Sequence, residues 1–400
     1  MIFTTVSIAQ DSPKSAHPSE PKSVTVPFTL DHDRIIIDVS IPLSNGTTQR
    51  VRAWVDNGNP ELYLSRRLSG LVGGSTSCDE RLCSGAPPSE LIIGGMTITI
   101  GTGIKEAKVP VGDAPIALGL SAEMSIPSTI LRNHDVLINF PDREFTIAQR
   151  GTLKFKGVTA KVIVNPANGL IQVPSQIENK KYNLALDLGS SISFLAADLF
   201  DKLSAAHPDW PHMTGAVGPA NMRGSNDEPT WKLMRVDRLQ YGPLFLTDVA
   251  VVDLHAEKGR MPLFEKQAGG ATAGQLGSEA LLNYRVGLDY AHSTVYFDIG
   301  RTFNVPDFDV IGLILRPEDD GRFTILGIAE SEGKPSVAEV QAGDRLIAID
   351  GIPVAGSTMG QVWSRLAGEA GKEHTLTVER NGKRFAVIAT VQHFLGENGQ

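Results

Sequence analysis

The sequence lacks the features that mark membrane-spanning, nucleic-acid-binding and metal-dependent proteins. No apolar run approaches the roughly 20 residues that a transmembrane helix needs. The formal net charge is −8 over 400 residues, which argues against nucleic acid or an acidic membrane surface as the main partner. The nine histidines show no metal-ligand spacing, and no glycine run has the strand-to-helix context of a phosphate loop. We therefore expect neither a metal nor a cofactor.

Cysteine is scarce, and its two copies stand close together. Cys78 and Cys83 lie in "SCDERLCSG", which allows a small disulfide ring in an oxidising compartment; reduced surface thiols are the alternative. Residues 1–22 begin apolar and turn polar and Pro/Ser-rich after Ala9, which is typical of the end of a secretory signal peptide followed by a flexible leader. A disordered cytoplasmic tail is the alternative. Together the two features favour an exported protein, periplasmic or secreted.

Glycine and proline, in contrast, are abundant, with 40 and 24 copies. Their abundance favours turn-rich β structure over helical bundles, and the chain length suggests two or three domains. From Val24 the sequence predicts strands, a hairpin turn at Asn45 and Gly46, and a returning strand, "RAWVDNG", that ends at Asp56. The apolar residues before Asp56 place its carboxylate at the edge of a buried region.

A second copy of this pattern begins near Val158. Strand-like runs, a turn at residues 179–181 and the segment "NLALDLGSS" lead to Asp187. "WVDNGNPELYLSRRL" aligns with "ALDLGSSISFLAADL", and "STILRNHDVLINFPDREFTI" aligns with "SEALLNYRVGLDYAHSTVYF". Two copies of one β-rich unit predict a pseudo-twofold axis that brings the two Asp-X-Gly turns together. Adjacent carboxyls share a proton, so one is able to activate water while the other protonates a carbonyl oxygen.

These duplicated units resemble the two lobes of an aspartic peptidase, most of all the bacterial retropepsin-like kind fused in tandem. The resemblance covers roughly residues 24–300. It implies a mainly β, bilobal, pseudo-twofold fold of aspartic-peptidase-like β-barrels, with lobes at residues 23–150 and 151–302. It also implies that Asp56 and Asp187 are catalytic and hydrolyse a peptide or protein substrate in a cleft between the lobes.

The residues that follow each aspartate depart from that family. Its Thr or Ser directly after the aspartate grips the backbone of the opposite loop, but Asn57 and Leu188 stand at these places. The amide of Asn57 both donates and accepts, so it is able to supply part of this bonding, whereas Leu188 is not. At the third position pepsin-like members bond the outer carboxylate oxygen with a hydroxyl; Ser190 fits this role, and Asn59 has an amide donor. The expected dyad support comprises Asn57, Gly58, Asn59, Leu188, Gly189 and Ser190.

The family also implies glycine-rich flaps over the cleft. Residues 69–88 and 213–231 are both glycine-punctuated and turn-rich, and ordinary surface loops are the alternative. Three functions remain open at this point. They are a working aspartic endopeptidase with a non-standard grip, a pseudopeptidase that binds peptides without cutting them, and a fold whose dyad serves acid–base chemistry on a small molecule.

Residues 303–396 have a different character and form a third predicted domain. "AGDRLIAIDGIPV", an apolar-Gly-apolar motif and a helix near Met359–Leu366 resemble a PDZ domain of the bacterial protease type. This resemblance implies that the backbone N–H groups of Ile311, Gly312 and Leu313 hold the carboxylate of a peptide C-terminus, with the peptide added as a strand. A PDZ fold that only packs against the two lobes is the alternative.

Overall fold

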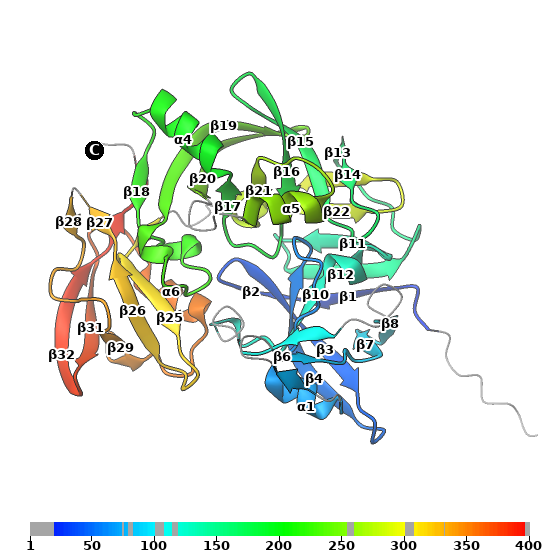
Figure 1. Ribbon diagram of the computed structural model, residues 1–400, viewed down its shortest axis with the longest axis horizontal. Helices are drawn as coiled ribbons and strands as arrows, with labels where there is room; N and C mark the ends of the chain where they lie inside the picture. The colour runs from blue at the N-terminus through cyan, green and yellow to red at the C-terminus, as the bar shows by residue number, and fades with distance from the viewer. Residues whose placement is uncertain are drawn as a thin grey trace, which may run out of the picture.

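The computed structural model describes residues 20–73, 76–78, 83–100, 108–113, 119–253, 260–300, 308–331 and 333–396. Most of the predicted leader and part of the first candidate flap lie outside these ranges. The described chain forms two β lobes and a smaller β domain, which is orange to red in Figure 1. The expected mainly β class is confirmed.

The elements follow one another in three groups. Lobe 1 holds β1 (Ser23–Pro27), β2 (Thr29–Asp31), β3 (Arg34–Pro42), β4 (Thr48–Asp56), α1 (Arg66–Leu71), β5 (Ser77–Cys78), β6 (Cys83–Gly85), β7 (Glu90–Ile93), β8 (Met96–Thr99), β9 (Val109–Val111), β10 (Met124–Pro127), α3 (Ser128–Leu131), β11 (His134–Asn139) and β12 (Glu144–Gln149). Lobe 2 holds β13 (Val158–Lys161), β14 (Ile163–Val164), β15 (Ile171–Ile177), β16 (Lys180–Leu186), β17 (Ser193–Leu195), α4 (Ala197–Ala206), β18 (His212–Thr214), η1 (Gly218–Ala220), η2 (Glu228–Thr230), β19 (Lys232–Tyr241), β20 (Leu244–Asp253), α5 (Arg260–Ala268), β21 (Gly274–Leu276), η4 (Glu279–Leu281), β22 (Tyr284–Asp289) and β23 (Thr294–Ile299). The third domain holds β24 (Asp309–Val310), β25 (Leu313–Pro317), β26 (Phe323–Ile328), β27 (Glu330–Ser331), β28 (Lys334–Pro335), β29 (Arg345–Ile349), β30 (Ile352–Pro353), α6 (Met359–Leu366), β31 (Glu373–Arg380), β32 (Lys383–Thr390) and β33 (Gln392–His393).

Lobe 1 is built around the predicted hairpin of β3 and β4. The two strands stay in register up to the pair Pro42–Thr48, and Gly46 closes the turn with a φ of +80°, a left-handed conformation that suits glycine. On the other side of β4, β10 runs parallel, with its last residue opposite Asp56. Asp56 therefore leaves the sheet at the end of a strand that is flanked on both sides.

Lobe 2 repeats this arrangement. β15 and β16 form a hairpin in which Ile177 pairs with Lys180, so Lys180 belongs to the strand and the turn begins one residue earlier than predicted. β21 runs parallel to β16, with Leu276 opposite Leu186. Asp187 follows directly and leaves its sheet in the same way as Asp56.

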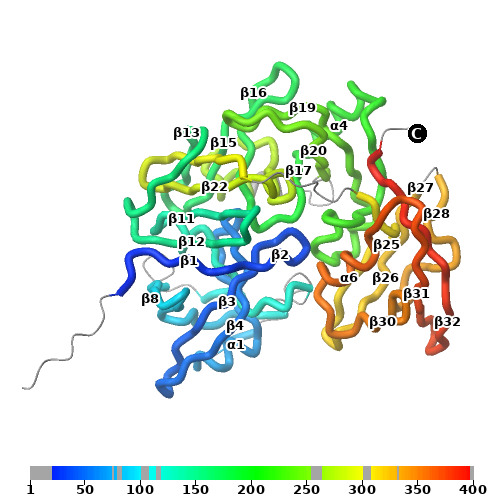
Figure 2. Tube along the Cα trace, turned by 180° about the vertical axis from the view of Figure 1, so that it is seen from behind, coloured from blue at the N-terminus to red at the C-terminus, as the bar shows by residue number. Residues whose placement is uncertain are grey.

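One six-stranded sheet joins the two lobes. Its strand order is β1-β12-β11-β22-β23-β13, so each lobe contributes three strands and the order reads alike from either edge. The central pair is β11 with β22, antiparallel, and the two strands lie side by side in both views (Figures 1 and 2). A continuous apolar core extends through both lobes. The expected bilobal, pseudo-twofold architecture is confirmed.

The third domain has a sheet of order β25-β26-β29-β31-β32 and one helix, α6. The helix predicted at Met359–Leu366 is confirmed, and a capping box between Thr358 and Gln361 fixes its start. Its apolar core continues into lobe 2, where Phe194 and Trp231 belong to the same buried cluster. Figure 2 shows α6 between β2 of lobe 1 and the sheet of this domain. Among the described helices, none has the length and apolar character required to cross a membrane.

Candidate functional site

Asp56 and Asp187 lie on facing turns where the two lobes meet. Both are buried, with 3% and 9% of their surface exposed. A Cβ added to Gly58 would lie 2.1 Å from Asp187 Cγ, and a Cβ added to Gly189 would lie 2.3 Å from Asp56 Oδ1. Each carboxyl thus rests on the glycine of the opposite turn, at a distance that only glycine permits. The structure brings the two turns together, as the duplication led us to expect.

The two carboxyls differ in how they ionise. Burial, followed by the negative charge of Asp187, raises the pKa of Asp56 well above its usual value. Burial also raises the pKa of Asp187, to about 6, against the opposing effects of the Gly189 N–H and the positive charge of Arg223. The N–H of Gly189 lies 3.0 Å from Asp187 Oδ1. Near neutral pH we therefore expect the pair to share one proton and one negative charge.

A single side chain locks the two turns together. Asn57 is fully buried; its Nδ2 donates to Leu186 O at 2.8 Å, and its Oδ1 accepts from Leu188 N at 2.7 Å. Both bonds cross from lobe 1 to the backbone on either side of Asp187. The sequence led us to expect only part of the grip from Asn57, yet its amide makes a bond with each of its two polar atoms. The side chain of Leu188 lies in the apolar core and needs no polar partner.

The carboxyls are supported by different amides. The side chain of Asn59 acts to lower the pKa of Asp56 through a hydrogen bond. The hydroxyl of Ser190 points instead to a backbone carbonyl two residues further on, at 2.7 Å, so its expected bond to the carboxylate of Asp187 was wrong. Gln275 takes that place, since its Nε2 donates to Asp187 Oδ2 at 2.7 Å. Sequence reasoning missed Gln275; the available signal was a polar residue just before the apolar-glycine turn that ends β21.

The buried guanidinium of Arg34 acts on the charge of the paired carboxyls, and sequence reasoning missed this residue as well. Arg34 is fully buried, and its positive charge acts to lower the pKa of Asp56. Its guanidinium donates to Met222 O and to His32 Nδ1, both at 3.0 Å. His32 Nε2 must carry the ring proton because it bonds Gly218 O at 2.7 Å. Burial, then the charge of Arg34, lowers the pKa of His32 to about 3, so the ring is neutral.

The structure describes only part of the first candidate flap and places much of the second in a buried position. Residues 69–88 lie partly outside the described chain; within the described part Cys78 and Cys83 form a disulfide, 2.07 Å between sulfurs, that joins β5 to β6. Residues 213–231 are mostly buried, and Asn221 is 0% exposed. The prediction of a mobile flap at residues 213–231 was wrong, because the third domain covers this segment.

In the expected carboxylate-binding loop of the third domain, two of the three N–H groups already donate to backbone carbonyls. Ile311 N donates to Leu366 O at 2.9 Å, and Leu313 N donates to Ile311 O at 2.7 Å. A Cβ on Gly312 would lie 2.2 Å from Ser336 Oγ, so the loop is also packed from the side. The expectation that all three N–H groups face a peptide carboxylate is therefore wrong for this conformation.

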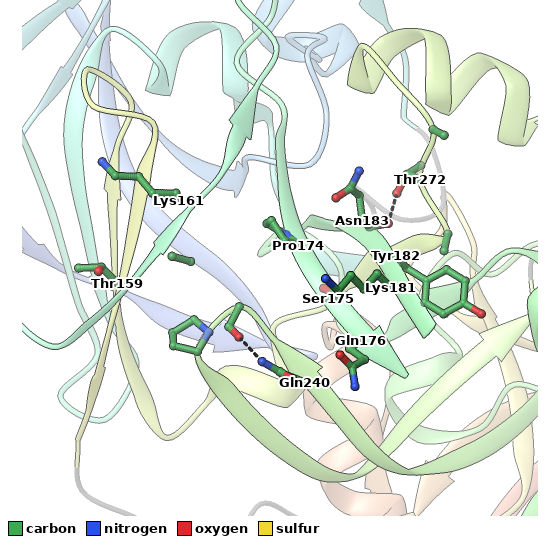
Figure 3. A pocket seen from close by; sticks show the side chains of 15 residues that line it. Thr159, Lys161, Pro174, Ser175, Gln176, Lys181, Tyr182, Asn183, Gln240 and Thr272 are labelled. Carbon is green, nitrogen blue, oxygen red and sulfur yellow. Dashed lines mark hydrogen bonds between the residues drawn. The ribbon is translucent and has the colours of Figure 1, made fainter. Parts of the chain in front are cut away.

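A cavity of about 870 Å³ opens on lobe 2, lined by residues of β13, β15 and β16 (Figure 3). Lys161 lies on one side of it, and on another Thr272 Oγ1 donates to Asn183 O at 3.1 Å. Neither Asp56 nor Asp187 lines this cavity. It is therefore not the place where the paired carboxyls would act.

The fold and the paired turns define a two-lobed β protein with a further β domain. Residues 332–380 match the family model of the PDZ domain, so this domain is a PDZ domain. No curated protein matches the chain. Among solved structures, the chain is similar to an aspartic proteinase from Irpex lacteus, with 14% identity, 70% of this chain and 97% of that chain covered, and a TM-score of 0.38. It is also similar to a photosystem II D1 C-terminal processing protease, with 22% identity, 21% and 23% of the chains covered, and a TM-score of 0.19. The chain spans less than a quarter of the length of that processing protease, and neither likeness assigns an activity to it.

Proposed function

We propose that this protein is an aspartic endopeptidase whose dyad is Asp56 and Asp187. The observation that carries the proposal is the reciprocal packing of each carboxyl on the glycine of the opposite turn. Two carboxyls in this arrangement cannot both ionise easily, so one keeps a proton. The lock made by Asn57 supports the proposal, because it fixes the relative position of the turns.

Because the pKa of Asp56 is raised well above its usual value and that of Asp187 to about 6, we assign the shared proton to Asp56. Asp187 takes a proton from water as the water oxygen attacks the substrate carbonyl carbon, and Asp56 gives its proton to the carbonyl oxygen. The resulting diol collapses when the proton on Asp187 passes to the amide nitrogen and the C–N bond breaks. One diol hydroxyl returns its proton to Asp56, which restores the starting state.

The wider assignment rests on the duplicated unit. The repeated hairpin, the strand-end aspartate and the parallel strand beside it support membership of the retropepsin-like aspartic peptidases, with both lobes in one chain. The disulfide between Cys78 and Cys83 supports an exported location, since disulfides persist in oxidising compartments. The PDZ domain adds a peptide- or protein-binding module to the proposed peptidase.

The test is cleavage of a quenched fluorescent peptide library by the full chain, from acidic to alkaline pH. Asp56→Asn and Asp187→Asn should each abolish turnover. Asp38→Asn is the matched control, because Asp38 is an exposed strand residue that pairs with Arg50 at the surface. Equal cleavage by all three variants would refute the dyad, and a peptide that binds the wild type but stays intact would support the non-cleaving alternative.

A further inference from the structure

The groove between β25 and α6 of the PDZ domain is already filled by a segment of lobe 2. We call this segment, residues 215–224 with the sequence "GAVGPANMRG", the docking segment. Ala216, Val217, Ala220 and Met222 are buried in one apolar cluster with residues of β25 and α6. The space between β25 and α6, beside the loop at residues 311–313, therefore has an occupant from the same chain.

Asn221 anchors the docking segment in the groove. Its Nδ2 donates to Leu315 O on β25 at 2.9 Å and to Glu228 Oε2 at 2.8 Å. Its Oδ1 accepts from Leu315 N at 2.9 Å and from Trp363 Nε1 on α6 at 3.2 Å. Both donors and both acceptor positions of the amide are thus used, and the residue is 0% exposed. Asn221 pairs with the backbone of the edge strand as an added strand does, and it also reaches the helix across the groove.

The docking segment runs along the groove from one end to the other. A Cβ on Gly218 would lie 3.7 Å from Val310 Cγ1, and a Cβ on Gly224 would lie 3.1 Å from both Arg316 Cγ and Pro317 Cδ. From Gly218 to Gly224 the segment therefore follows β25 in the same direction. A peptide with its carboxylate at residues 311–313 would have to run in the opposite direction, through the space that the segment occupies.

The docking segment also touches the turn that carries Asp187. Ser191 Oγ donates to Pro219 O at 3.0 Å, and Ser190 Oγ lies 3.5 Å from Met222 Sδ. The backbone of Met222 accepts from the buried Arg34 of lobe 1 at 3.0 Å. One short segment thus contacts the PDZ groove on one side and the neighbours of the dyad on the other.

Lobe 1 also contacts both the docking segment and α6 of the PDZ domain. The ring of His32 bonds Gly218 O and stacks on Trp363 of α6, with 6.3 Å between ring centroids. Asp31 Oδ1 accepts from Gly360 N at 2.9 Å, in the first turn of α6. The PDZ domain is therefore fastened to both lobes around the docking segment.

We infer that the partner of the PDZ groove is the chain's own docking segment, and that an external peptide enters the groove only by displacing it. Displacement removes contacts from Ser190 and Ser191, so ligand access to the groove is coupled to the support of the Asp187 turn. The effect on cleavage rests on the proposed peptidase function. The effects on amide exchange and on peptide binding do not, so failure of one part is distinguishable from failure of the other.

The first experiment measures hydrogen exchange in the full chain. Asn221→Ala should speed exchange of the Leu315 amide by about tenfold or more, which corresponds to the loss of one buried hydrogen bond. Asn226→Ala is the matched control, because Asn226 is an exposed residue of the neighbouring loop whose Oδ1 accepts from the half-buried Arg316 of β25 at 2.8 Å. Trp363→Phe removes one bond to Asn221 and should give a smaller change in the same direction. Equal exchange of Leu315 in all variants would overturn the inference.

The second experiment supplies the docking segment in trans. The synthetic peptide GAVGPANMRG should bind full-length Asn221→Ala about tenfold or more tightly than wild type, because the wild-type groove is occupied. The peptide GAVGPAAMRG, which lacks the anchoring amide, should bind neither protein. Equal binding of the first peptide to both proteins would refute an occupied groove. In a cleavage assay Asn221→Ala should lower kcat more than it raises KM, and Asn226→Ala should change neither.

Discussion

The lock made by Asn57 offers a direct test of how the two lobes hold the paired carboxyls. Asn57→Ala removes both cross-lobe bonds at once, from Nδ2 to Leu186 O at 2.8 Å and from Leu188 N to Oδ1 at 2.7 Å. Because Asn57 is 0% exposed, both backbone groups lose their partner in a buried place. The change leaves the two aspartates themselves intact.

The expected loss follows from these two groups. A buried backbone donor or acceptor without a partner costs about 1–3 kcal/mol, so Asn57→Ala should lower the free energy of unfolding by about 2–6 kcal/mol. The two turns also lose their fixed separation, and a displacement of about 1 Å lowers a catalytic rate by about two orders of magnitude. Asn57→Thr keeps a hydroxyl on a shorter side chain and should lie between Asn57→Ala and the wild type.

Urea unfolding followed by tryptophan fluorescence measures the stability change, and kcat for a cleaved peptide measures the effect on rate. Asn45→Ala is the matched control, since Asn45 Oδ1 also accepts two bonds, from Thr47 N at 3.0 Å and Thr47 Oγ1 at 2.7 Å, in an exposed turn. Its loss should stay below about 1 kcal/mol. If Asn57→Ala and Asn45→Ala cost the same, Asn57 does not lock the turns.

Three further predictions concern the dyad directly. Cleavage should fall as the pH drops through about 6, because protonation of Asp187 removes the base while Asp56 keeps its proton to higher pH; a profile of kcat/KM that keeps rising into acid would contradict these roles. Gln275→Leu removes a hydrogen bond that lowers the pKa of Asp187, so the acidic limb of that profile should move to higher pH, and an unmoved limb would exclude Gln275 as a positioning residue. Gly58→Ala should abolish cleavage because its Cβ would lie 2.1 Å from Asp187 Cγ, whereas Gly70→Ala, with nothing within 4 Å of the added Cβ, should keep the wild-type kcat.

The two-lobed fold was predictable because the chain carries its architecture twice. Each copy has a hairpin, a strand that ends in an aspartate, and a later strand that runs parallel to it. Alignment of Asp56 with Asp187 was enough to place both turns at equivalent points. The shared sheet was not predictable in the same way, because the pairing of β11 with β22 depends on backbone hydrogen bonds between distant strands that leave no periodic pattern.

The surroundings of the dyad were predictable only where they are local in sequence. Asn57 and Asn59 follow Asp56 directly, so spacing alone identified them. Gln275 is distant in sequence from Asp187 and reaches it only because β21 runs parallel to β16. Arg34 belongs to "DHDR", a polar run between two apolar strands that is typical of an exposed turn. It is buried because lobe 2 and the PDZ domain cover that turn, which no pattern within lobe 1 reveals.

Asn57 and Leu188 stand where the resemblance to aspartic peptidases leads us to expect Thr or Ser, and the two differences are better understood together than as two defects. A hydroxyl offers a single hydrogen, so a grip built from hydroxyls needs one from each lobe. An amide carries its donors and its acceptor on separate atoms, and Asn57 bonds a carbonyl and an N–H of the opposite turn at the same time. Position 188 then has no need to reach across, and an apolar side chain fits the core that surrounds it. An apolar side chain at position 188 therefore leaves no buried side-chain polar group without a partner. The proposed function requires the two turns to keep a fixed separation, and the two bonds of Asn57 join them directly.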